Sequence, residues 1–319
     1  MKRLECLDGL RGVLAVYVMI GHMAPFAASP DAVVRPLSHG GAAVDVFFML
    51  SGLVIMRSLQ ACDYAARPFL IARFARIFPV FLVMFLAGVA VQPLPVPFGA
   101  MPWIGPESPA HGIWSTGWPL SWPLDVMAHL TMTHGLFPNA VAPFMWVSFL
   151  GAAWSLSTEW QFYILALCLG RTRMGAGWLV VCLFCVALAG LIWDMAAPEA
   201  WHFSRAFLPN KAAYFALGIA SGIWVDSRRF VGFMLALAAT LGMSVAHGRW
   251  EALLPPLFWT LCLAAQLYPR GLAPVAFVLR SRPVRYLGAI SFPIYLANEP
   301  IQKILGIFLS GLALSLIHI

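Results

Sequence analysis

The stretch that decides the fold runs from Leu7 to His22 and has the sequence LDGLRGVLAVYVMIGH. It is typical of the start of a membrane-spanning helix, except that it carries the ionisable side chains Asp8, Arg11 and His22. Such groups are costly inside a bilayer, so they normally face the interior of a helix bundle and serve a function there. The eleven-residue separation of Arg11 and His22 points both to one side of a helix, about 16 Å apart along its axis. The stretch therefore predicts a fixed cation near one membrane surface and a titratable imidazole deeper in the bilayer.

The composition places this helix in a polytopic membrane protein. Of the 319 residues, 61% are hydrophobic and only 10% are charged, whereas about 25% are charged in a typical soluble domain. The net charge of +7 could indicate a nucleic-acid partner, but no basic run with interleaved aromatic residues exists, so we expect none. We predict an all-α polytopic membrane protein in which residues 1–319 form a single integral-membrane domain. Asp8 and Arg11 would interrupt the core of a signal peptide, so the first span is expected to stay uncleaved.

The apolar segments predict a bundle of about nine to ten transmembrane helices. Fifteen of the 20 Lys and Arg residues lie on one side of the predicted spans and four on the other, with Lys303 unassigned. Because these residues concentrate in cytoplasmic loops, a cytoplasmic amino terminus and an external segment from Val91 to Pro143 are expected. The residues after about position 308 are too few for another crossing of about 20 residues, so the last span is expected to be truncated. The predicted spans cover about residues 9–28, 41–58, 76–91, 146–169, 176–195, 210–226, 230–246, 252–268 and 286–308.

Two further groups of polar residues fall within or beside these spans. Arg73 and Arg76 share a helical face at the cytoplasmic mouth of the third predicted span. They could anchor the topology or fork onto phosphate groups. Glu159 lies inside the fourth span, where a carboxylate usually has a partner. Ser155, Glu159 and Tyr163 follow four-residue spacing, so we predict one polar stripe.

The cysteines and histidines do not indicate a metal site. Cys182 and Cys185 form a CxxC pair in an apolar span, but no second pair exists, so packing is the preferred interpretation. His129 and His134 are five residues apart, which is poor spacing for shared ligation on a helix. We therefore predict no bound metal.

These motifs resemble, in the same order, those of the membrane acyltransferase-3 family, which O-acylates bacterial surface glycans, lipids and antibiotics. The resemblance extends over residues 7–308. The family usually has His where this chain has Asn298, so the polar group there cannot titrate. The family also closes with a last span and a Glu-Arg-Pro-like end that this sequence lacks. The matching segments are Leu7–Gly12 with His22, Asp45–Gly52 (FFxLSG), Arg73–Arg76 (RxxR), Trp154–Glu159 followed by Phe162 and Tyr163 (WSLSxE…FY), and Leu287–Leu296 (similar to LGxxSYxxYL).

The resemblance implies a membrane-bound O-acyltransferase of the O-antigen or glycan O-acetylase type. Such an enzyme moves an acyl group, typically acetyl, from acyl-coenzyme A on the cytoplasmic side to a hydroxyl of a surface glycan or lipid-linked saccharide. It needs no tightly bound cofactor, because acyl-coenzyme A is its donor substrate. The resemblance also implies a multi-pass protein of the bacterial cytoplasmic (inner) membrane, with the lipid bilayer as its other partner.

The resemblance and the residue chemistry together assign roles to the candidate residues. His22 is the expected general base, for the acceptor hydroxyl or for an acyl relay, because an imidazole titrates near neutral pH. Arg11 is expected to steer the donor's phosphates or to polarise its thioester carbonyl. The remaining candidates are Glu159 and Asp8 as carboxylates that orient or hold charge on His22 or Arg11, Arg73 and Arg76 as ligands of the coenzyme A phosphates, and Ser51 and Ser155 as hydrogen-bond donors to the substrates.

A proton-coupled transporter or flippase of small or lipid-linked substrates is the alternative. Ionisable residues inside a bundle of this size are also typical of such carriers. However, the chain shows no inverted repeat, and its proline-interrupted segment near Asn298 has no counterpart in the first half. The enzyme is therefore the favoured interpretation.

Overall fold

A computed structural model describes residues 4–27, 31–96, 98–108, 110–114, 117–170, 175–246, 248 and 250–317. Within these ranges the chain forms fourteen α-helices and eight short 3-10 helices, with no β-strand, so the prediction of an all-α fold is confirmed. Some residues used to predict the topology lie outside the described residues: Lys2, Arg3, Arg171, Arg173 and Arg249.

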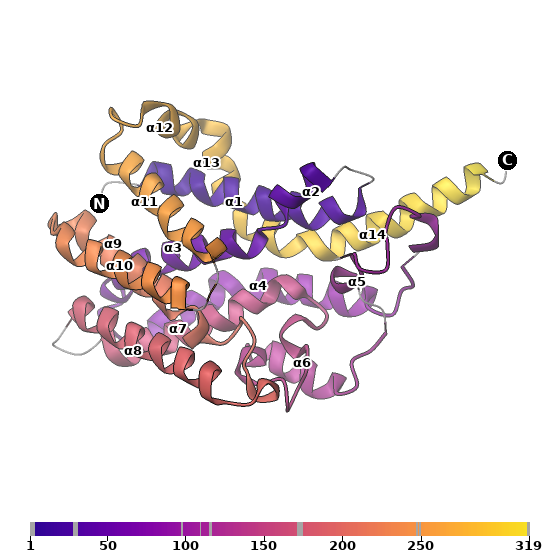
Figure 1. Cartoon of the computed structure of the whole chain (residues 1–319), viewed down its shortest axis with the longest axis horizontal. Coiled ribbons are helices and arrows are strands. Elements are labelled where there is room, and N and C mark those ends of the chain that lie inside the picture. Colours follow the sequence, from indigo (N-terminus) through magenta and orange to yellow (C-terminus); the bar gives the residue numbers. More distant parts are fainter. Residues whose placement is uncertain are drawn as a thin grey trace.

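The α-helices are labelled along the chain in Figure 1. They are α1 (Glu5–Met23), α2 (Asp31–Leu37), α3 (Gly40–Ala61), α4 (Ala66–Val91), α5 (Ala110–Ile113), α6 (Trp122–Leu130), α7 (Trp154–Gly170), α8 (Gly175–Ala196), α9 (Ala212–Ser227), α10 (Phe230–Ala246), α11 (Leu254–Leu267), α12 (Ala273–Arg280), α13 (Arg282–Ala289) and α14 (Ser291–Ile317).

Several helices have the length and composition of membrane spans. Among the described residues, four helical segments are long and apolar enough to cross a bilayer: Glu5–Phe26, Val34–Ala61, Ala66–Val91 and Gly175–Ala196. The helix Phe230–Ala246 is apolar but shorter. The structure thus supports a helical membrane protein, and the count of about nine to ten spans stays a prediction.

Two helices begin at residues that differ from the predicted limits of their spans, and both differences affect the candidate site. The helix α4, which contains the third predicted span, starts about ten residues before it, at Ala66. Arg73 and Arg76 therefore lie within a helix, and their place at the cytoplasmic mouth of the span stays a prediction. The helix α7 starts after the predicted beginning of the fourth span, because short 3-10 turns, η4 (Met145–Val147) and η5 (Gly151–Ala153), precede it.

The predicted ninth span is divided into two helices at Ile290. This residue has non-helical backbone angles (φ −105°, ψ 12°) and separates α13 from α14. Pro293 lies in the first turn of α14, where its missing N–H costs no internal helical hydrogen bond. The Ser291 hydroxyl donates to the Gly288 carbonyl at 2.9 Å across the break. The helix α14 then continues to Ile317, beyond the predicted end of that span.

Glycine contacts bring α3 against α9. A Cβ atom built on Gly218 would lie 2.1 Å from the Met49 carbonyl oxygen, and one built on Gly52 would lie 2.3 Å from that of Phe215. Both distances are too short for any side chain, so the two backbones touch. Glycine at these two positions therefore allows the tight packing of α3 on α9.

The first helix packs against both halves of the broken segment. A Cβ atom on Gly288 of α13 would lie 1.8 Å from the Asp8 carbonyl oxygen, and one on Gly12 would lie 2.6 Å from the Gly288 nitrogen. Farther along, α1 also lies beside α14, where the Gln302 side-chain amide donates to the Met19 carbonyl at 3.0 Å. Figure 1 shows α1 between α13 and α3, with α14 alongside. The α13–α14 break is therefore held beside the first turns of α1.

Candidate active site

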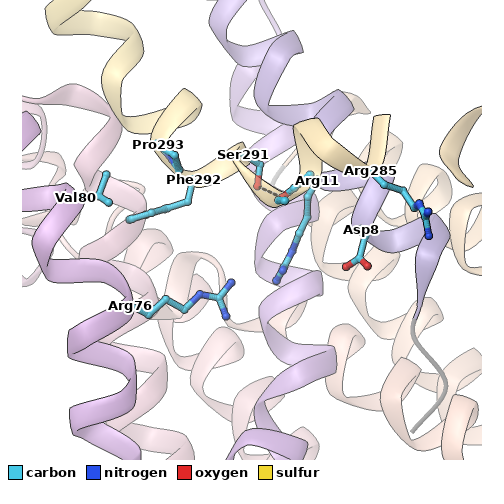
Figure 2. A pocket seen from close by; sticks show the side chains of 10 residues that line it. Asp8, Arg11, Arg76, Val80, Arg285, Ser291, Phe292 and Pro293 are labelled. Atoms are coloured by element: carbon cyan, nitrogen blue, oxygen red, sulfur yellow. Dashed lines mark hydrogen bonds between the residues drawn. The ribbon is translucent and has the colours of Figure 1, made fainter. Parts of the chain in front are cut away.

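A cavity of about 330 Å³ lies at the α13–α14 break. Figure 2 shows that its charged groups come from three helices: Asp8 and Arg11 from α1, Arg76 from α4 and Arg285 from α13. Among the described residues, neither Arg11 nor Arg76 makes a side-chain hydrogen bond or an ion pair. The cavity thus presents guanidinium groups that can accept an anionic ligand. Its other lining residues are Val80, Gly288, Ala289, Ser291, Phe292 and Pro293.

A second, smaller cavity of about 90 Å³ adjoins the first. Both are lined by Arg11, Arg76, Ser291 and Phe292. The second cavity extends between α3 and α7, where predicted site residues line it: Ser51, Ser155 and Glu159. Its apolar lining consists of Val44, Phe47, Phe48, Leu156 and the ring of Tyr295. Six of the eight predicted site residues therefore line two connected cavities.

His22 lies in the last turn of α1, where Asn298 of α14 sets its orientation. The His22 Nδ1 atom is 3.0 Å from the Asn298 side-chain oxygen. The Asn298 amide nitrogen donates to the Tyr295 carbonyl at 2.8 Å, so its oxygen is the atom left to face the imidazole. Because that oxygen can only accept, Nδ1 of His22 carries the proton in the neutral ring. The Nε2 atom then has a lone pair available for a proton.

Glu299 is a site residue that sequence reasoning did not assign. One of its carboxylate oxygens lies 3.6 Å from Nδ1 of His22. The other accepts from the Ala152 backbone N–H at 3.2 Å. The available signal was a carboxylate inside an apolar helix, the same signal that singled out Glu159. Of the two glutamates, Glu299 is the one beside the imidazole, whereas Glu159 and Arg11 line the same cavity.

The 3-10 turn η5 connects the His22 cluster with the second cavity. The Tyr295 hydroxyl donates to the Ala152 carbonyl at 3.0 Å, and the Ala152 N–H donates to Glu299. On α14, Ser291 lines the cationic cavity and Asn298 contacts His22. The two residues are seven positions apart, which is about 10 Å along a helix. The cationic cavity and the imidazole therefore lie at different depths beside the same two helices, α1 and α14.

Comparison with known proteins identifies the family. A family model described as an acyltransferase domain matches residues 4–318. The chain belongs to this family. This family is the acyltransferase-3 family that the sequence motifs resemble. The match therefore supports an acyltransferase and not the alternative of a transporter or flippase. The chain is also similar to the acyltransferase MdmB of Streptomyces mycarofaciens, with 27% identity over 335 residues that cover 93% of this chain and 78% of that protein. No solved structure matches the chain.

In this acyltransferase, two hydroxyl groups hold the carboxylate of Glu159. One of its oxygens accepts from the Ser51 hydroxyl at 2.5 Å and from the Tyr163 hydroxyl at 2.5 Å. The Tyr163 contact agrees with the predicted polar stripe. Ser155 has a different role in the stripe, because its hydroxyl donates to the Ala152 carbonyl at 3.2 Å and lies 3.1 Å from the Tyr295 hydroxyl.

The two arginines of the RxxR segment are placed differently in the acyltransferase. Arg76 lines both cavities. The guanidinium of Arg73 instead lies over the rings of Phe69 and Tyr163, 5.5 and 5.4 Å from their centroids, and donates to the Ser58 hydroxyl. It does not line either of the two described cavities, so a fork of both arginines onto one ligand stays a prediction.

The buried pair His129 and His134 lies apart from this site, in the acyltransferase segment between α4 and α7. Their rings stack with centroids 4.1 Å apart and planes 4° apart. His129 Nδ1 bonds the Asp125 carbonyl at 2.8 Å, and His134 Nε2 bonds the Ala153 carbonyl at 3.1 Å. Burial lowers the pKa of His134 from 6.5 to about 4, so its ring is neutral at physiological pH. A neutral, stacked pair is consistent with a structural role.

Proposed function

We propose that this acyltransferase takes an acyl group, typically acetyl, from acyl-coenzyme A and transfers it to a hydroxyl of a surface glycan or lipid-linked saccharide. The observation that supports the donor is the cavity in which the guanidinium groups of Arg11 and Arg76 make no side-chain hydrogen bond or ion pair among the described residues. Coenzyme A carries a diphosphate and a phosphomonoester, and guanidinium groups bind phosphates through charge-assisted hydrogen bonds.

The two cavities suit the two ends of such a donor. Its diphosphate would bind between Arg11 and Arg76, which line both cavities. The acyl-pantetheine arm would then extend along the smaller second cavity, half of whose lining residues are apolar or aromatic. Ser51 and Ser155 offer hydrogen-bonding groups there. Arg11 would serve the diphosphate and not the thioester carbonyl, because His22 is eleven residues, about 16 Å, farther along α1.

His22 would act as the general base. Its Nε2 atom takes the proton from the acceptor hydroxyl as the hydroxyl oxygen attacks the thioester carbon. The C–S bond then breaks, and the coenzyme A thiolate takes the proton from the imidazolium. Asn298 and Glu299 stabilise the imidazolium, because one accepts from its Nδ1–H and the other places a carboxylate 3.6 Å away. Transfer thus requires the donor's thioester to reach the depth of His22.

The proposed orientation follows from the positive charges. Their distribution supports a cytoplasmic amino terminus. The family match over residues 4–318 supports one integral-membrane domain over residues 1–319, and the family resemblance implies a bacterial cytoplasmic membrane. Since Asp8 and Arg11 lie in the first turns of α1, the cationic cavity would open toward the cytoplasm, where acyl-coenzyme A is present. His22, at the other end of α1, would face the acceptor.

The test uses the purified full-length protein, [¹⁴C]acetyl-coenzyme A and a membrane extract that contains lipid-linked saccharides, without any ion gradient. We expect label to enter the saccharide fraction, and we expect His22→Ala to lower the rate by about 10²- to 10⁴-fold, the range for loss of a general base. The matched control is His111→Ala, because His111 is an exposed histidine outside both cavities. Undiminished transfer by a folded His22→Ala variant would refute the base, and failure of the wild type to bind acetyl-coenzyme A would refute the donor.

A further inference from the structure

Arg285 is a third guanidinium on the cationic cavity, although its sequence context predicts only a cytoplasmic loop. Figure 2 shows Arg285 and Arg11 on either side of Asp8, with Arg76 across the cavity. The lining residues thus include three positive groups and one carboxylate. An excess of positive charge in a confined space favours an anion that carries several negative charges.

Close packing of α13 on α1 determines the position of Arg285. The backbone contact between Gly288 and Asp8 leaves no room for a side chain on the glycine. Because α13 contains only eight residues, this contact also holds Arg285, one turn earlier, against the first turns of α1. The cation therefore belongs to the rigid wall of the cavity and not to a loose loop.

Arg285 forms an ion pair with Glu5 that an anionic ligand can replace. Its Nη1 donates to a carboxylate oxygen of Glu5, and the two side chains are 26% and 42% exposed. Ion pairs this exposed are weak, because water screens them and ordering two long side chains costs entropy. The Nε atom of Arg285 is buried and has no hydrogen-bond partner among the described residues. A phosphate that displaced Glu5 would supply acceptor oxygens to the guanidinium of Arg285.

We propose that Arg285 binds the terminal 3′-phosphate of the coenzyme A donor and releases Glu5 when it does so. This proposal rests on the proposed donor site. Arg11 and Arg76 line both cavities and are therefore near the path of the acyl arm. Arg285 lines the first cavity and not the second. In coenzyme A the diphosphate is nearer the thioester and the phosphomonoester lies at the far, adenosine end. The order of the arginines along the cavities matches the order of the phosphates along the donor.

The test compares the binding of coenzyme A and dephospho-coenzyme A, which lacks the 3′-phosphate, to the purified protein by titration calorimetry. For the wild type we expect the Kd of dephospho-coenzyme A to be about tenfold higher, which corresponds to one charge-assisted hydrogen-bonded contact. Arg285→Gln should raise the Kd of coenzyme A by a similar factor and leave that of dephospho-coenzyme A unchanged. The matched control is Arg282→Gln, because Arg282 is exposed on the same helix and does not line the cavity.

A second variant keeps the proposal testable if Arg285→Gln does not fold. Glu5→Gln removes the competing carboxylate, so it should lower the Kd of coenzyme A and leave that of dephospho-coenzyme A unchanged. Equal affinity of the wild type for both ligands would overturn the role of Arg285 while the donor site stands. An unchanged preference for coenzyme A in folded Arg285→Gln, or no effect of Glu5→Gln, would overturn it as well. If the wild type binds neither ligand, the proposed donor site itself fails.

Discussion

Replacing Asn298 with leucine tests whether the hydrogen bond from His22 to Asn298 positions the proposed general base. Asn298 is buried, accepts from Nδ1 of His22 at 3.0 Å and donates to the Tyr295 carbonyl at 2.8 Å. Leucine has a similar volume but makes neither bond. A hydrogen bond to a charged partner, such as the imidazolium, contributes about 1.5–3 kcal/mol. At about 1.4 kcal/mol for each tenfold change in rate, kcat should fall by about 10- to 100-fold.

The Michaelis constant separates this effect from general damage. Asn298 lines neither of the two described cavities. If only the transition state loses an interaction, the KM for acetyl-coenzyme A should therefore stay within about twofold of the wild-type value. Asn298→Asp keeps an acceptor oxygen at the same place and should restore most of the rate. The assay is steady-state acetyl transfer by protein that elutes as a single species. If folded Asn298→Leu retains the wild-type kcat, His22 does not depend on this hydrogen bond, and the positioning role is refuted.

Three other predictions concern the donor, the topology and pH. Arg76→Gln should raise the KM for acetyl-coenzyme A by about tenfold and Arg73→Gln by much less, because only the former residue of this pair lines the described cavities; equal effects in steady-state kinetics would support the shared fork. In intact cells, a membrane-impermeant thiol reagent should label a cysteine placed at Ser108 and miss the native Cys62; the reverse pattern would invert the orientation and move the acceptor to the cytoplasm. The neutral, buried His134 resists a proton until about pH 4, whereas in the unfolded chain it binds one below about 6.5. Acidification between these values should therefore lower the free energy of unfolding by up to about 3 kcal/mol. The midpoint of thermal denaturation should fall with pH over this range, and it should depend less on pH in His134→Phe.

The sequence by itself determined the helical membrane class, the family and most of the residues at the cavities. Hydropathy and helical periodicity depend on neighbours a few residues apart, so they are legible without a tertiary structure. The apolar helices α8 and α10 accordingly begin and end close to their predicted limits. Likewise, the cost of a charge inside a bilayer singled out Arg11, His22 and Glu159 from their apolar surroundings.

Only the tertiary structure decided which charged groups meet. The sequence marks Glu159 and Glu299 by the same signal, and it is the packing of α14 beside α1 that brings the second one to His22, 277 positions away. Arg285 reaches the cavity because glycines let α13 and α1 touch along their backbones. The break at Ile290 likewise leaves the apolar pattern of the segment almost unchanged, yet it creates the end of α14 on which the cavity forms. Such contacts depend on the relative positions of distant helices, and a local pattern of residue types does not contain that information.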